Sequence, residues 1–167
     1  MIKKYRKIKI VITDVDGVLT DGGIYTGPKG ILFKKFNVKD GAAVQILKSI
    51  EIDTVIMSSE TDQVNKKILE SRSKKIGVKH CFSSIRDKHK FLLNFMSKNH
   101  LKSENIVYIG DDINDLGAIK LAGIRVCPAD AVHEIKKICN ISLSRAGGKG
   151  CFRELADKIF LGLSKND

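Results

Sequence analysis

The stretch Ile8-Lys9-Ile10-Val11-Ile12-Thr13, followed at once by Asp14-Val15-Asp16-Gly17, decides the fold of this chain. The short apolar run predicts a buried strand over Ile8–Thr13. Two carboxylates directly after such a strand are costly unless a cation or hydrogen bonds compensate them. One Asp would suffice as a helix cap. Two, followed by Gly17, favour an acidic pocket for a hard cation such as Mg²⁺.

Outward from this stretch, short runs rich in Val and Ile alternate with amphipathic segments of helical length. Further strands are predicted at Thr54–Met57, Lys79–Phe82, Asn105–Ile109 and Ile124–Cys127. Helices are predicted at Gly41–Ile50, Asp62–Ile76, Asp87–His100, Asn114–Leu121, Ala131–Ile138 and Cys151–Leu163. This alternation predicts an α/β fold, a doubly wound parallel sheet covered on both faces. In such sheets ligands bind beyond the carboxyl ends of the strands.

One segment departs from the alternation. Residues 22–36 read as short strands at Ile24–Thr26 and Ile31–Phe36 around the turn Gly27-Pro28-Lys29-Gly30. This pattern predicts a small β-hairpin inserted between the first strand and the first helix. The insertion is too small to be a domain, and a chain of 167 residues fits one domain over 1–167.

A second acidic cluster, Gly110-Asp111-Asp112-Ile113-Asn114-Asp115, follows the apolar run Ile106–Ile109. Asn114 alone could be a helix cap. Parallel strands would bring this cluster and the first one to the same edge of the sheet, where together they can hold one cation.

Residues after two further strands supply a hydroxyl donor and a positive charge to act beside these carboxylates. Ser58 follows Thr54–Met57, and its hydroxyl can donate to a phosphoryl oxygen. Lys88 opens the segment after Phe82 and can neutralise both an aspartate and a bound phosphate.

The order Asp14-x-Asp16, Ser58, Lys88 and Gly110-Asp111-Asp112-x-Asn114-Asp115 resembles the four motifs of the haloacid dehalogenase superfamily of phosphatases. The resemblance implies that Asp14 attacks phosphorus to give an aspartyl-phosphate and that Asp16 protonates the leaving group. Ser58 and Lys88 would hold the phosphoryl oxygens. Mg²⁺ would lie between the Asp14 carboxylate, the Asp16 backbone carbonyl and Asp111, and Asp112 would act through a water or by orienting Lys88.

A finer resemblance involves three segments: Asp16-Gly17-Val18-Leu19-Thr20-Asp21-Gly22, Phe36-Asn37-Val38-Lys39-Asp40-Gly41, and Ala146-Gly147-Gly148-Lys149-Gly150 with Arg153-Glu154. They are similar to the small, capless phosphatases that act on 3-deoxy-D-manno-octulosonate 8-phosphate or on sialic-acid-type nonulosonate 9-phosphates. That subfamily implies no cap domain and a homotetramer in which the hairpins associate and a neighbouring subunit completes each site.

The residues after Ser58 bear on the substrate. Octulosonate 8-phosphate phosphatases typically have Thr or Ser, then Gly, then Arg here, whereas this chain has Ser58-Ser59-Glu60. Glu60 resembles the nine-carbon enzymes, and Arg72 and Lys75 match the basic pair that helps those relatives to bind substrate. Ser59, Glu60, Arg72 and Lys75 are therefore the predicted substrate-binding residues. The expected substrate is a nonulosonate 9-phosphate; the alternative is octulosonate 8-phosphate, in lipopolysaccharide synthesis.

A phosphoacceptor domain, or a phosphatase-like oligomerisation module without turnover, is the rival from a different functional class. Asp16 argues against a phosphoacceptor, which needs no leaving-group acid. An oligomerisation module would have lost a catalytic residue, and none is lost.

Net charge is +11, yet the basic residues are spread along the chain without a recognition module, so no nucleic-acid partner is expected. Cys81, Cys127, Cys139 and Cys151 form no C-x-x-C pair and indicate inert thiols in a reducing compartment. No stretch approaches the ~20 apolar residues of a membrane span. The expectation is a cytoplasmic protein without a membrane partner.

Overall fold

A parallel sheet forms the centre of the structure, a computed structural model that describes residues 5–28 and 30–164. Its six strands lie in the order β5-β4-β1-β6-β7-β8. They span β1 Ile10–Thr13, β4 Asp53–Met57, β5 His80–Phe82, β6 Ile106–Ile109, β7 Ile124–Cys127 and β8 Ile141–Ser142. The first five match predicted strands to within two residues at either end. The sixth has only two residues, too few for a sequence pattern.

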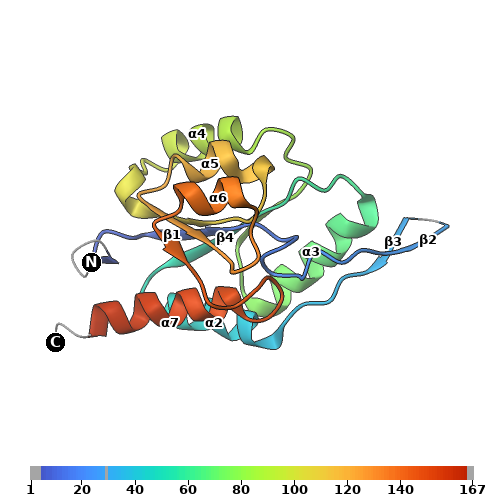
Figure 1. The fold of residues 1–167 in the computed structure, drawn as a ribbon, viewed down its shortest axis with the longest axis horizontal. Coiled ribbons are helices and arrows are strands. Elements are labelled where there is room, and N and C mark those ends of the chain that lie inside the picture. Colours follow the sequence, from blue (N-terminus) through green and yellow to red (C-terminus); the bar gives the residue numbers. More distant parts are fainter. Residues whose placement is uncertain (1–4, 29, 165–167) are drawn as a thin grey trace.

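Helices cover both faces of this sheet, as the strand and helix alternation predicted (Figure 1). Helices α4, α5 and α6 lie on one face, and α2, α3 and α7 pack on the other. Their bounds are α2 Val38–Ser49, α3 Gln63–Ile76, α4 Lys88–Lys98, α5 Leu116–Ile119, α6 His133–Ile138 and α7 Cys151–Ser164. The prediction of a doubly wound α/β fold is confirmed.

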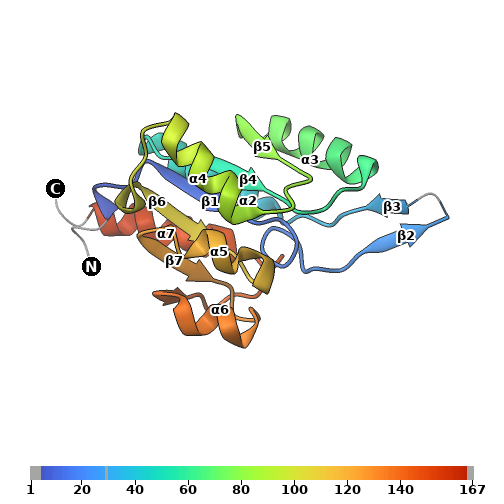
Figure 2. The same ribbon diagram turned by 90° about the horizontal axis from the view of Figure 1, so that it is seen from above.

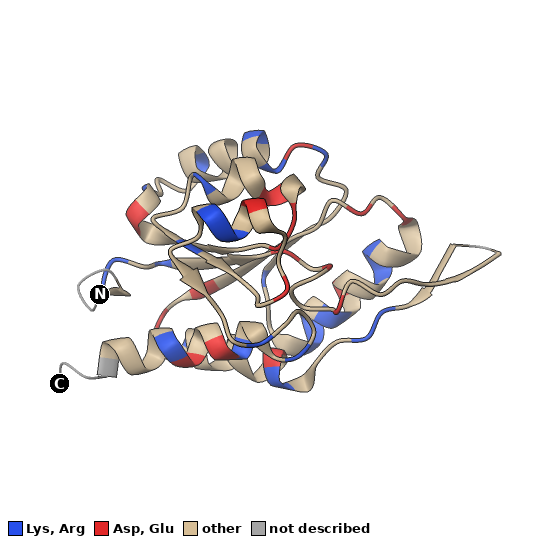
Figure 3. Cartoon of the chain, viewed as in Figure 1, with Lys and Arg blue, Asp and Glu red and all other residues tan. Residues whose placement is uncertain are grey.

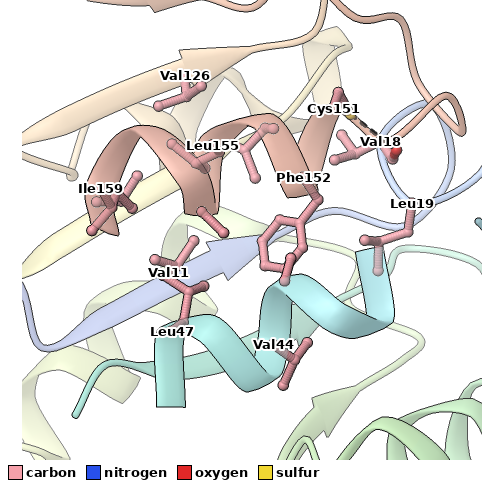
Figure 4. Close-up of a cluster of buried hydrophobic side chains, with 14 of the residues drawn as sticks. Val11, Val18, Leu19, Val44, Leu47, Val126, Cys151, Phe152, Leu155 and Ile159 are labelled. Atoms are coloured by element: carbon pink, nitrogen blue, oxygen red, sulfur yellow. Dashed lines mark hydrogen bonds between the residues drawn. The ribbon is translucent and has the colours of Figure 1, made fainter. Parts of the chain in front are cut away.

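The alternation of side chains along each strand divides the core into two clusters. Val11 of β1 faces α2 and α7, whereas its neighbours Ile10 and Ile12 face α4 and α5. In Figure 4, Phe152 of α7 points into the first cluster, towards Val11 and α2. Phe152 is fully buried, and burial of such a side chain contributes about 1.5–3 kcal/mol.

The helix predicted at Asn114–Leu121 is shorter in the structure. A 3₁₀ turn, η2, spans Ile113–Asp115, and α5 follows over Leu116–Ile119. The Asp112 side chain accepts a hydrogen bond from the Ile113 N–H and so starts the chain on a tight turn. Bonds of the i→i+3 type from Leu121 and Ala122 then end the helix.

The predicted hairpin is present as an antiparallel pair, β2 Tyr25–Gly27 and β3 Gly30–Phe33, and it extends away from the main sheet (Figure 2). Tyr25 stacks on Phe33 at 4.4 Å between ring centroids. The second strand ends at Phe33, before the predicted Phe36, and the next side chain, Lys34, is buried. Lys29 of the predicted turn lies outside the described residues.

The strand order places a crevice at the end of β1. Successive connections run from β1 to β4 and β5 on one side and return to β6 on the other, so the order reverses at β1. Thr13 pairs with Ile56 of β4 and Ile109 of β6, so the residues after these three strands meet at one edge. Ligands of doubly wound sheets bind at such a switch point.

Charged residues and cysteines are distributed over the described part of the chain. Lys and Arg are spread over helices on both faces of the sheet (Figure 3). All four cysteines are free thiols. Within the described residues, no helix combines the length and the apolar character needed to cross a bilayer.

Candidate active site

Asp14, the first residue after β1, lies almost fully buried at the carboxyl edge of the sheet. Its backbone N–H donates to the carbonyl of Ile109 and continues the pairing of β1 with β6. Burial raises the pKa of the Asp14 carboxyl well above its usual range, and the nearby charge of Asp115 adds to this, while Lys88 opposes it. Asp14 is therefore a carboxylate that needs positive charge beside it to stay ionised.

Lys88, the first residue of α4, supplies part of that charge. The Asp87 side chain caps the helix by accepting from the Lys90 N–H, which fixes where α4 begins. The Lys88 Nζ lies 2.8 Å from Asp14 Oδ1 and 2.7 Å from Asp115 Oδ1, with no side-chain exposure. Burial alone would lower the pKa of Lys88, but the charges of Asp14 and Asp115 outweigh it and raise the pKa.

Asp115 is a site residue to which the sequence analysis assigned no role. Its Oδ1 accepts from Lys88 and, at 2.8 Å, from the Tyr108 hydroxyl. Its Oδ2 accepts from the Asp111 N–H at 3.1 Å. A Cβ at Gly110 would collide with the Asp115 carboxylate, so a glycine is required there. The signal available in the sequence was that Asp115 closes the second acidic cluster.

Asp111 and Asp112 point in different directions. The Asp111 carboxylate is held against Gly17, whose φ of +88° and lack of a Cβ leave room for it. Asp111 Oδ1 is buried without a hydrogen-bond partner. Burial, followed by the charges of Asp115 and Asp112, raises the pKa of Asp111 to about 7. Asp112 is exposed, and its Oδ1 caps Ile113 N at 2.7 Å.

A divalent cation fits this arrangement. Among the described residues, Asp14, Asp111 and Asp115 each offer a carboxylate oxygen, and these oxygens lie within 4.8 Å of one another. The orphaned Asp111 Oδ1 lacks the positive partner that a buried carboxylate requires. An all-oxygen donor set suits a hard cation. Asp115 already accepts three hydrogen bonds, so Asp14 and Asp111 have more ligand capacity left for a metal.

Asp16 stands beside this cluster and pairs with a lysine that the sequence analysis did not select. Lys34, the residue after β3, places its Nζ 2.6 Å from each oxygen of the Asp16 carboxylate. The Thr20 Oγ1 lies 3.2 Å from Asp16 Oδ1. The lysine fell within a predicted strand, and nothing in the local pattern indicated that its side chain points inward.

The loop after β4 carries Ser58, Ser59 and Glu60. Ser58 is buried, and its Oγ accepts from the Glu60 N–H at 3.2 Å, which leaves the hydroxyl proton available to another acceptor. Glu60 Oε1 accepts from the backbone N–H groups of Thr61 and Asp62 at 2.8 and 3.1 Å. One carboxylate oxygen of Glu60 is thus committed to the start of the next helix.

A cavity of about 460 Å³ lies over these residues. Its walls come from the β1 loop, the hairpin base, the β4 loop and the β6 loop. It is lined by Asp14, Asp16, Gly17, Gly22, Ile24, Ser59, Glu60, Thr61, Asp111, Asp112 and Asn114. The sequence-predicted Asp14, Asp16, Ser59, Glu60, Asp111 and Asp112 therefore face one space.

Arg72 and Lys75 of α3 do not line this cavity. Arg72 Nη2 donates to the Asn37 carbonyl at 3.0 Å, and its guanidinium lies 5.4 Å over the Phe36 ring. Arg72 thereby ties α3 to the segment that precedes α2, and Lys75 is exposed. Their predicted part in substrate binding stays a prediction.

Residues 26–151 match the family described as haloacid dehalogenase-like hydrolase. This chain belongs to that family. It is similar to two enzymes named 3-deoxy-D-manno-octulosonate 8-phosphate phosphatase KdsC. The Haemophilus influenzae enzyme is 36% identical over 99% of this chain and 90% of its own length. The Escherichia coli enzyme is 32% identical over 100% of this chain and 87% of its own length.

Solved structures of this hydrolase family resemble the fold closely. The cobalt-bound form of the Haemophilus influenzae phosphatase has a TM-score of 0.89 at 36% identity, covering 97% of this chain and 92% of that one. The Moraxella catarrhalis phosphatase, in complex with magnesium ion, phosphate ion and a KDO molecule, has a TM-score of 0.88 at 28% identity. The match covers 98% of this chain and 92% of that one. The predictions of superfamily, capless fold and phosphoric monoester hydrolase are confirmed.

Proposed function

We propose that this hydrolase removes the phosphate of 3-deoxy-D-manno-octulosonate 8-phosphate and uses Mg²⁺ to do so. The observation that carries the proposal is the similarity, over nearly the whole chain, to phosphatases named for that substrate, one of them solved with magnesium, phosphate and KDO. This substrate was the alternative in the sequence analysis, and it is better supported than the nonulosonate 9-phosphate first expected.

The contacts of Glu60 bear on the substrate first expected. That expectation rested on the resemblance of Glu60 to the nine-carbon enzymes and on its predicted part in substrate binding. In the structure Glu60 Oε1 already accepts two backbone hydrogen bonds and organises the loop after Ser59. Glu60 therefore has a local structural role that does not depend on the length of the sugar.

The reaction proposed for the site begins at Asp14. Its carboxylate oxygen forms a bond to phosphorus while the ester P–O bond breaks, giving an aspartyl-phosphate. Asp16 gives a proton to the departing sugar oxygen and then takes one from the water that hydrolyses the intermediate. Lys88 holds Asp14 in place through its 2.8 Å contact, and Ser58 is the proposed hydroxyl donor to a phosphoryl oxygen.

Asp14 and Asp111 would hold the cation, with Asp16 contributing its backbone carbonyl and Asp112 standing nearby. Bound there, Mg²⁺ supplies positive charge that offsets the charge of the phosphoryl group. It would also supply the buried Asp111 Oδ1 with the partner that it lacks.

The substrate carboxylate needs a cation that this cavity does not present. The described residues that line it include carboxylates, hydroxyls and backbone, but neither Lys nor Arg. A neighbouring subunit is the proposed source, in a homotetramer joined through the hairpin. Exposed Ile24, Tyr25, Leu32 and Phe33 give that hairpin an apolar surface. Light scattering should then report about four times the 18.5 kDa chain mass.

The test is release of inorganic phosphate from a panel of eight- and nine-carbon keto-sugar phosphates with Mg²⁺. We expect kcat/KM for octulosonate 8-phosphate to exceed that for the nonulosonate 9-phosphates by about tenfold or more. Glu60→Arg tests whether this position sets the preference, and Asp14→Asn is the inactive control. A preference for a nonulosonate would reject the substrate but leave the phosphatase standing. Near-native turnover by Asp14→Asn would reject the covalent mechanism.

A further inference from the structure

The Lys34 ammonium is buried against the cavity wall although it comes from the base of a protruding hairpin. Its side chain is 1% exposed, whereas the Asp16 side chain to which it donates is 34% exposed. Both oxygens of Asp16 lie 2.6 Å from Nζ. Asp16 thus has one side fixed by protein and another side open to the cavity.

The two oxygens of Asp16 are not equivalent. Oδ1 lies near a second donor, the Thr20 hydroxyl at 3.2 Å. Thr20 is itself buried, and its Oγ1 also accepts from the Gly22 N–H at 3.3 Å, which fixes its position in the β1 loop. Oδ2 has Lys34 as its hydrogen-bond donor within the described structure.

This asymmetry matters for a group that must donate a proton. An ammonium has donors and no acceptor, so it can bind only an unprotonated oxygen of a carboxylic acid. Lys34 lies equally close to both oxygens and does not distinguish them, so the Thr20 hydroxyl is the contact that favours Oδ1 as the unprotonated oxygen. When Asp16 is protonated, the proton therefore sits on Oδ2, which gives up its contact with Lys34 while Lys34 keeps Oδ1.

We propose that Lys34, assisted by Thr20, is the positioning residue of the general acid: it holds Oδ1 of Asp16 so that the protonated Oδ2 faces the ester oxygen. The proposal rests on the function proposed above, in which Asp16 protonates the leaving group. As the P–O bond breaks, its electron pair passes to the ester oxygen, which takes the proton from Oδ2. Lys34 keeps its own protons throughout.

A neighbouring ion pair offers a matched control. Lys35, the next residue, pairs with Asp21 at 2.6 Å, so both lysines join the hairpin base to an aspartate of the β1 loop. The Lys35 side chain is 52% exposed, and neither it nor Asp21 lines the cavity. Lys35→Met therefore removes a similar link without touching Asp16.

The experiment compares kcat/KM for two leaving groups. One substrate is octulosonate 8-phosphate, or the sugar phosphate of the panel that is turned over fastest; its alkoxide needs a proton to leave. The other is 4-nitrophenyl phosphate, whose phenolate leaves without one. Lys34→Met should lower kcat/KM for the sugar phosphate by about 10- to 100-fold, part of the ~10²–10⁴-fold that general acids supply. The loss should appear in kcat, and 4-nitrophenyl phosphate should change by less than about threefold.

Three further variants complete the design. Asp16→Asn should show the same leaving-group dependence with a larger loss. Lys34→Met should then cost little more when added to Asp16→Asn, since both changes remove the same function. Thr20→Val should act in the same direction as Lys34→Met with a smaller loss, and Lys35→Met should match the wild type on both substrates.

Equal losses on both substrates, a change in KM alone, or no loss in Lys34→Met would overturn the positioning role. If circular dichroism shows that Lys34→Met does not fold, Thr20→Val decides the question by the same criterion. If Asp16→Asn itself fails to discriminate between the leaving groups, the proposed acid role is what fails. The two failures are therefore distinguishable.

Discussion

Replacing Lys88 with Met should both destabilise the fold and stop catalysis. The Nζ lies 2.8 Å from Asp14 Oδ1 and 2.7 Å from Asp115 Oδ1, and the three side chains are at most 5% exposed. Removing one partner of a buried pair leaves uncompensated charge, which typically costs about 3–5 kcal/mol. Methionine keeps most of the lysine volume, so little of this cost comes from packing. We therefore expect a loss of about 3–5 kcal/mol in the free energy of unfolding.

The pH dependence of this loss has a definite sign. Burial and Asp115 already raise the pKa of Asp14, and Lys88 is the group that opposes them. Without Lys88 the folded state would take up protons more readily than the unfolded chain. The variant should then gain stability as the pH falls, and its difference from the wild type should shrink.

Urea unfolding in the presence of chelator, at neutral pH and at about pH 5, measures both effects. Lys90→Met is the control, because Lys90 is exposed and lies within the same turn of α4. It should change stability by less than about 0.5 kcal/mol. Phosphatase activity of Lys88→Met should fall by about 10²-fold or more, since Asp14 loses its orienting partner. A stability loss below about 1 kcal/mol together with retained activity would refute the reasoning.

Three other perturbations test the site and its supports. Gly17→Ala should lower the free energy of unfolding by about 1–2 kcal/mol and remove most of the activity, because Gly17 has φ +88° and an added Cβ would collide with the Asp111 carboxylate. Gly23→Ala, at an ordinary φ, is the control, and thermal unfolding and turnover are measured for both variants. Burial raises the pKa of Asp40 to about 6, although the hydrogen bond from the Arg153 N–H acts in the opposite direction. Because the folded state binds this proton more tightly than the unfolded chain does, wild-type stability should fall as the pH rises from about 4 to about 6. Asp40→Asn should reduce that slope, leaving the part due to the raised pKa values of Asp14 and Asp111, and should stabilise the protein near pH 8 by up to about 3 kcal/mol. A variant less stable than the wild type there would contradict this. Chelation should abolish activity and lower the melting temperature, with Mg²⁺ restoring both; full activity in excess chelator would rule out the metal.

The fold and the acidic edge could be predicted because they depend on local pattern. Near-continuous apolar runs at β1, β4 and β6 mark strands buried on both faces, and parallel strands end at one edge. Asp14 and Asp111 follow two of these strands, so their proximity follows from topology alone. The hairpin was predictable for the same reason, since its turn residues interrupt the alternation.

The partners of these residues could not be predicted, because they depend on tertiary contacts between distant segments. The 3₁₀ turn at Ile113–Asp115 turns Asp115 inward to Lys88 and leaves Asp112 exposed. Glu60 lines the cavity as a substrate-binding residue would, but the two backbone hydrogen bonds that its Oε1 accepts could not be predicted from the sequence.

Lys34 shows most clearly the difference between what the sequence pattern predicts and what tertiary contacts decide. By itself the sequence determined which segments are buried, in what order the strands and helices follow, and which edge of the sheet gathers the carboxylates, because hydrophobic periodicity acts over a few residues. Only the tertiary structure decided which cation meets which carboxylate. Lys34 turns inward because Asp16, across the β1 loop, offers a buried ammonium the two acceptors that compensate its loss of water.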